Sequence, residues 1–140
     1  NSAVRYFAAK YAAGTLWPTD PGERSEADRW MDWQLSTIHT GMREIFWGLI
    51  RTPPEKRDMA SIAKTAADTG KLWARLNERL AGKVYVAGQH FTMGDIPVGC
   101  WIHSWFALPV ERPELKNVKA WYERLQTRPA YARHVMVPLT

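Results

Sequence analysis

Apolar side chains recur along this chain mostly three or four residues apart, which is the spacing of one face of an α-helix. Between residues 20 and 50 the stripe consists of Trp30, Ile38, Met42, Ile45 and Leu49. Between residues 52 and 82 it consists of Met59, Ile62, Ala66, Trp73, Leu76 and Leu80. Because both stretches are long and a tight turn joins them, the pattern predicts two helices that pack antiparallel.

A shorter helix is predicted at the start of the chain, over residues 3–13. Its apolar face consists of Val4, Phe7, Ala8 and Tyr11. Gly14 ends it, because glycine readily takes the left-handed conformation that often follows a helix. Asp20 and Pro21 then suit the cap and the first position of the next helix.

The most specific local signal is Thr92 followed three residues later by Asp95. Such a pair predicts a capping box, in which the acid bonds back to the N–H of the capping residue at a helix start. Residues 113–126 and 129–134 predict two further helices, and the one strand-like run, residues 83–86, is too short to found a sheet. The predicted fold class is therefore all-α, a bundle of five to six helices.

Composition narrows the classes of function. Eight Trp among 140 residues favour a packed core or an apolar ligand cleft. The single cysteine, Cys100, excludes an intrachain disulfide and suggests a reducing, cytoplasmic location. It lies in an apolar run, so a buried structural thiol is the favoured interpretation. The longest uncharged stretch, residues 96–110, is too short to span a membrane.

The net charge of +5 raises the question of nucleic-acid binding. Basic residues are interleaved with acidic ones, as in residues 55–58, and there is no basic run or nucleic-acid motif. No specific nucleic-acid partner is therefore expected. The four histidines have no metal-ligand spacing, so no metal is expected either.

Residues 85–88 read Tyr-Val-Ala-Gly, and residues 91–96 read Phe-Thr-Met-Gly-Asp-Ile. This segment resembles the aromatic-x-Ala-Gly-x-x-Phe-Ser/Thr-x-Ala-Asp-Ile stretch in the C-terminal domain of glutathione transferases, with Gly94 in place of the usual Ala. Residues 30–33 and 121–131 are also similar to that family, and the resemblance extends over essentially the whole chain. It implies a bacterial, beta- or theta-like transferase of the detoxifying type.

The same resemblance divides the chain in two. Residues 1–14 resemble the last helix of the family's thioredoxin-like domain, and residues 15–140 its C-terminal helical domain. In the family, a Glu-Ser pair just before this point holds the γ-glutamyl end of glutathione. The resemblance thus implies that most of the thioredoxin-like domain is missing, that no catalytic residue lies in these 140 residues, and that the chain alone is inactive.

Ser36, His39, Thr40 and Arg43 can share one helix face, because they lie three or four residues apart. Residues 35–41 resemble the segment of beta-class transferases in which a His followed by Lys faces glutathione. The resemblance implies that His39, Thr40 and Arg43 contact glutathione, with Thr40 replacing the Lys, and that Ser36 lines the substrate pocket. The alternative is that His39 is a surface or interface histidine.

Trp101, His103 and Trp105 lie on the helix that follows the Thr92 and Asp95 pair, where the family draws aromatic residues for its hydrophobic site. The resemblance implies that Trp105 lines the substrate pocket. Packing in the core is an equally good interpretation for all three side chains.

Two functions follow from these expectations. In the first, the chain is the C-terminal domain of a homodimeric glutathione transferase. It then supplies the second-substrate site and dimer contacts for conjugation of glutathione to a small hydrophobic electrophile. In the second, it is a non-catalytic protein-interaction module, because the same helical fold is appended to translation factors and synthetases and a fold alone does not establish chemistry.

Overall fold

The computed structural model describes all 140 residues, and its regular elements are helices. The α-helices are α1 (Ser2–Tyr11), α2 (Pro21–Trp33), α3 (His39–Phe46), α4 (Met59–Arg79), α5 (Asp95–Ala107), α6 (Lys116–Gln126) and α7 (Pro129–His134). Two π-helical turns, Gln34–Ile38 and Trp47–Arg51, continue α2 and α3, so residues 21–51 form one long rod. The chain has six helical rods and no strand, which confirms the predicted all-α class.

The long rod starts where the sequence predicts. The Asp20 carboxylate accepts a hydrogen bond from the Glu23 N–H at 2.8 Å, and Pro21 occupies the first helical position. The first N–H groups of a helix have no partner within the helix. Asp20 accepts a hydrogen bond from one of them, and Pro21 has no N–H that needs a partner. The predicted stripe is buried along its whole length: Trp30, Ile38, Met42, Ile45 and Leu49.

The first π turn keeps this stripe on one side of the rod. Trp30, Gln34, Ile38 and Met42 are spaced four residues apart, and all four are buried. In a regular α-helix, each four-residue step overshoots a full turn by roughly 40°, so three steps would carry the side chains well around the rod. A π turn holds more residues per turn. The turn Gln34–Ile38 therefore absorbs most of this drift.

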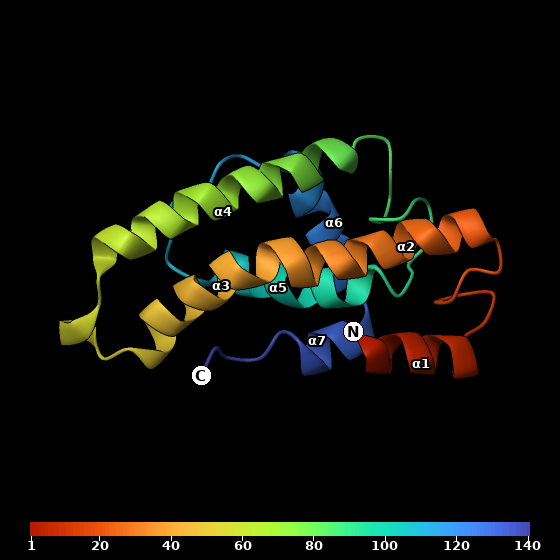
Figure 1. Cartoon of the computed structure of the whole chain (residues 1–140), viewed down its shortest axis with the longest axis horizontal. Helices are drawn as coiled ribbons and strands as arrows, with labels where there is room; N and C mark the ends of the chain where they lie inside the picture. Colours follow the sequence, from red (N-terminus) through yellow and green to blue (C-terminus); the bar gives the residue numbers. More distant parts are fainter.

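Helix α4 packs antiparallel to the rod, as predicted (Figure 1). The expected start near Thr52 is wrong, because the prolines of this segment lead into a separate 3₁₀ turn, Pro54–Lys56. Asp58 caps α4 instead, accepting a hydrogen bond from the Ser61 N–H at 2.9 Å. Met59 then falls in the first turn and is 55% exposed, outside the buried stripe.

Helix α5 lies at the centre of the bundle, in contact with α2, α3 and α6. Its buried face consists of Asp95, Val98, Gly99, Ile102 and Trp105. Cys100 is exposed, so the interpretation of a buried thiol is wrong. On a helix that buries residues 98, 99 and 102, position 100 points away from the core. Helix α6, predicted from residue 113, begins at Lys116.

Helix α1 packs on α2 differently from the prediction. Of its predicted apolar face only Ala8 is buried, whereas Phe7 and Tyr11 are 57% and 69% exposed. Ala8 belongs to a small cluster separate from the main core, with Ala27, Met31 and Met93. The Arg5 guanidinium also holds α1 against α2, through ion pairs to Asp28 at 2.7 Å and Asp32 at 2.5 Å. The aromatic side chains of α1 therefore face outward.

Candidate functional site

His39 is the first residue of α3, directly after the π turn, and lies against α5. Its ring meets the Trp101 indole edge to face, with centroids 5.5 Å apart and planes at 65°. Both side chains are partly exposed, and the imidazole takes part in no hydrogen bond within the chain. The structure thus brings together the predicted glutathione-contacting histidine and one of the three aromatic candidates on α5.

Ser36, Thr40 and Arg43 lie on the exposed side of the same rod. The Ser36 hydroxyl lies 3.2 Å from that of Thr37, and the Arg43 guanidinium lies 5.5 Å from the centre of the Trp47 ring. No hydrogen bond or ion pair joins these three side chains to the His39 ring. They form an open polar surface.

Trp105 lies in the interior. Its side chain has no exposed surface, packs beside Trp73 with ring centroids 6.3 Å apart, and leaves its indole N–H without a partner. This placement favours the core-packing interpretation, because a ligand reaches no atom of the ring. His103 instead pairs through Nδ1 with the Tyr122 hydroxyl at 2.9 Å, and burial raises the pKa of Tyr122.

The Thr92 and Asp95 pair forms one half of the predicted capping box. The Asp95 carboxylate accepts a hydrogen bond from the Thr92 N–H at 2.9 Å. The Thr92 hydroxyl donates to the same carboxylate at 3.4 Å, instead of accepting a hydrogen bond from the Asp95 backbone N–H. The carboxylate also accepts the Val86 N–H at 3.0 Å and the Trp121 indole N–H at 2.9 Å. Sequence reasoning missed these last two contacts. They make Asp95 a junction between α5, α6 and the preceding loop.

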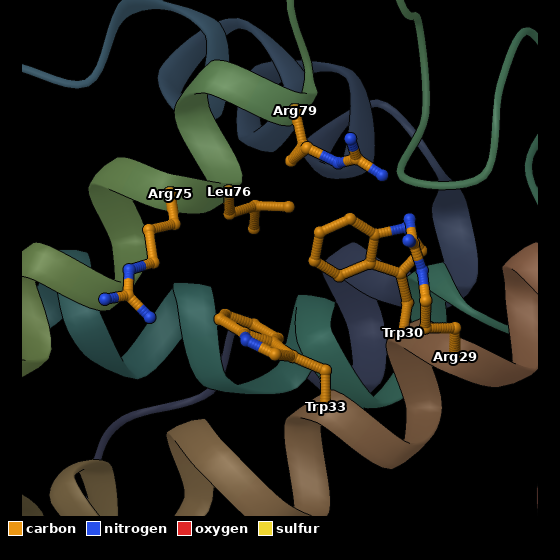
Figure 2. Close-up of a pocket in the computed structure, with 6 residues that line it drawn as sticks. All are labelled: Arg29, Trp30, Trp33, Arg75, Leu76 and Arg79. Atoms are coloured by element: carbon orange, nitrogen blue, oxygen red, sulfur yellow. The ribbon is translucent and has the colours of Figure 1, made fainter.

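A cleft that sequence reasoning also missed opens between α2 and α4 (Figure 2). Its volume is about 220 Å³, and its lining consists of Arg29, Trp30, Trp33, Arg75, Leu76 and Arg79. The sequence offered two signals. Arg75 and Arg79 lie four residues apart on one predicted helix, and Arg29 lies beside Trp30 on the other. Neither signal says that the two groups face each other.

Two further observations concern cofactors and membranes. No group of three or more His, Cys, Asp and Glu side chains comes together in a way that could hold a metal ion. No helix combines the length and the apolar character that crossing a bilayer requires.

Comparison with known proteins identifies the family. The family model described as "Glutathione S-transferase, C-terminal domain" matches residues 39–129. Glutathione S-transferase GstB of Escherichia coli K12 is 38% identical over all 140 residues, which correspond to 67% of its own length. The chain belongs to the glutathione S-transferase family. The matched segment of this glutathione S-transferase domain begins at His39 and ends at the first residue of α7.

Solved structures agree with this assignment. The theta class glutathione S-transferase from Xanthomonas axonopodis pv. citri, crystallised with glutathione bound, is 50% identical to the glutathione S-transferase domain described here. It aligns with a TM-score of 0.94, over 99% of this chain and 73% of its own. A more distant relative, the E. coli disulfide-bond oxidoreductase YfcG, is 26% identical over 132 residues, which are 93% of this chain and 59% of its own.

Proposed function

We propose that this domain supplies the second-substrate surface of a glutathione transferase. Glutathione is the co-substrate, a small hydrophobic electrophile is the second substrate, and the working protein is a homodimer. A thioredoxin-like domain outside these 140 residues holds and activates the glutathione thiol. The observation that carries the proposal is the 50% identity, over 99% of the chain, to a transferase crystallised with glutathione.

The pair of His39 and Trp101 gives the proposed site its chemistry. A thiolate is the reactive form of glutathione, so neighbouring groups must favour its negative charge. The His39 ring makes no hydrogen bond within the chain, so its N–H can donate to the peptide or the sulfur, and Arg43 adds a positive charge on the same rod. The partly exposed face of Trp101 offers apolar surface to the electrophile. Ser36 and Thr40 extend the polar side of this surface.

A chimera tests the proposal. We would use the 140 residues to replace the matched segment of E. coli GstB, which is 67% of its length, and keep the rest of that protein. The chimera should conjugate glutathione to 1-chloro-2,4-dinitrobenzene, whereas the 140 residues alone should show no turnover above background. Replacing His39 by Ala in the chimera should lower kcat/KM about tenfold, the loss of one polar contact worth about 1.4 kcal/mol in the transition state.

Arg133→Gln serves as the control, because Arg133 is exposed on α7 and takes part in no ion pair. Its kcat/KM should equal that of the parent chimera. A chimera that folds and binds glutathione but does not conjugate would contradict the proposal and favour the interaction module. An active chimera that tolerates His39→Ala would remove His39 from the site.

A further inference from the structure

A second cleft lies at the end of the bundle where α1 leads into α2 (Figure 1). One wall is the linker between these helices, and the other combines the loop before α5, residues 90–92, with Arg128 at the start of α7. We call it the linker cleft. Its volume of about 600 Å³ falls within the range of roughly 300–1,000 Å³ typical of small-molecule pockets.

The two walls of the linker cleft are fastened to each other. The Met93 N–H donates to the Leu16 carbonyl oxygen at 3.0 Å, which ties the loop before α5 to the linker. The Arg24 guanidinium donates to the Pro18 carbonyl oxygen at 3.2 Å, which ties the linker to α2. The cleft therefore exists before any ligand enters it, and little ordering is needed on binding.

Arg128 presents an unpaired cation to this cleft. Its guanidinium carbon lies 3.6 Å from the centre of the Phe91 ring, and Tyr85 meets that ring edge to face with centroids 5.6 Å apart. The guanidinium is thus held in place, yet it takes part in none of the chain's ion pairs. Its planar N–H donors remain available, and a carboxylate matches their geometry.

Glu23 brings the opposite charge to the same lining. It lies in the first turn of α2, it is exposed, and its carboxylate also takes part in no ion pair. Arg128 and Glu23 therefore border one cleft without neutralising each other. A ligand that carries both charges meets the opposite charge at each of them.

The separation of these two side chains restricts the ligand further. Because Arg128 and Glu23 do not reach each other, the charges of the ligand must also be set apart. They are set apart at the two ends of a short peptide, whereas a free amino acid carries both on one α-carbon. Thr19 and His90 line the same cleft and can bond to the peptide groups between the two ends.

We propose that the linker cleft binds a short zwitterionic peptide. Its terminal carboxylate pairs with Arg128, and its terminal ammonium pairs with Glu23. This inference is independent of the proposed transferase function, because it uses no residue of the His39 surface.

Isothermal titration of the 140-residue chain with trialanine tests the proposal. We expect saturable binding of one peptide per chain. N-acetyl-trialanine, which lacks the ammonium, and trialanine amide, which lacks the carboxylate, should each bind at least tenfold more weakly. These comparisons use the parent chain, so they do not depend on the folding of any variant.

Two variants assign each end of the peptide to its partner. Arg128→Gln should weaken trialanine binding at least tenfold and leave the weak binding of trialanine amide unchanged. Glu23→Gln should weaken trialanine binding at least tenfold and leave the weak binding of N-acetyl-trialanine unchanged. The control Arg133→Gln removes a positive charge at an exposed position on α7 and should bind trialanine like the parent. Circular dichroism checks that each variant is folded.

Several outcomes would overturn the inference. Absence of trialanine binding would exclude a peptide site, and equal binding of the three peptides would show that the terminal charges are not recognised. Equal binding of trialanine by the parent, Arg128→Gln and Glu23→Gln would place the peptide elsewhere on the chain. Acetate that binds as tightly as trialanine would reduce the cleft to a site for a carboxylate alone.

Discussion

At the scale of single residues, Asp95 does more than cap a helix. Its carboxylate is almost completely buried and faces four donors from Val86, Thr92 and Trp121. Burial raises the pKa of Asp95 from 3.8 to about 6, although the hydrogen bonds act in the opposite direction. The ionised carboxylate is thus costly to bury and at the same time joins α5, α6 and the loop before them.

This arrangement predicts a characteristic dependence of stability on pH. In the unfolded chain Asp95 ionises near its ordinary pKa, whereas the folded chain holds the proton until about pH 6. Raising the pH between these values removes a proton that the folded state binds more tightly, so the stabilising contribution of Asp95 falls. Relative to Asp95→Asn, the free energy of unfolding should fall by about 2 kcal/mol between about pH 4 and about pH 7.

Urea unfolding of both proteins across this range measures the difference. If the difference is flat or rises with pH, the four donors outweigh the burial of the carboxylate.

The sequence predicted the local part of this junction and missed the distant part. Thr92 and Asp95 are three residues apart, so their hydrogen bond follows from helix geometry alone. The bond from Trp121 spans 26 residues and depends on where α6 packs. Likewise, the pattern placed His39 on a helix face, but only the packing of α3 against α5 shows that its neighbour is Trp101.

At the scale of elements, Gly94 sets the distance between α5 and α2. A Cβ atom at this position would lie 2.8 Å from the Ala27 carbonyl oxygen and 3.1 Å from its Cα. Because both atoms belong to the backbone of α2, neither can move aside by changing a side-chain rotamer. The departure from the family pattern at Gly94 therefore coincides with a close approach of the two helices.

Replacing Gly94 by Ala should destabilise the fold by about 1–3 kcal/mol, the usual cost of overpacking a core. The midpoint of urea unfolding reports the loss. Gly22→Ala is the matched control, since an added Cβ there meets only the Asp20 side chain, at 3.1 Å. That variant should lose less stability than Gly94→Ala, because the atom that the added Cβ meets belongs to a side chain, which can shift, and alanine favours a helix more than glycine does. Equal stability of the two variants would show that α5 can shift away from α2.

Most element boundaries were predictable, and two expectations failed for different reasons. The cap at Asp20 and the stripe of the long rod follow from local chemistry. The start of α4 was expected too early, because residues 54–56 form a separate 3₁₀ turn and Asp58 supplies the cap. The apolar face of α1 was wrong because periodicity identifies an apolar face without showing whether the rest of the chain covers it.

At the scale of the whole molecule, the chain consists of a large core and a small attached cluster. All helices from α2 through α7 contribute side chains to the large core. Helix α1 is attached instead through Ala8 and the ion pairs of Arg5. The division at residue 14, between a remnant helix and the helical domain, stays a prediction. The cleft between α2 and α4 could not be predicted at all, because it depends on how two helices face each other.

Replacing Arg5 by Ala should loosen α1 alone. Its ion pairs are partly exposed, and each such pair contributes roughly 0–1 kcal/mol. Global stability should therefore change little, while amide hydrogen exchange in Ser2–Tyr11 becomes faster and exchange in α4 and α5 stays the same. Lys71→Ala, which removes an exposed pair with Asp68 on α4, should leave α1 unchanged. Faster exchange throughout the chain would mean that α1 is integral to the core.

The π turn at Gln34–Ile38 has a consequence for how this rod tolerates changes in length. A π turn accommodates one residue more than the α-helical turn it replaces, so deleting one residue within Gln34–Ile38 would restore a regular helix and leave every later side chain close to its present angle around the axis. His39 would stay against Trp101, and Met42 and Ile45 would stay in the core. A homologue one residue shorter at this point therefore keeps the same apolar pattern up to Arg51, and the alignment gap belongs inside the π turn.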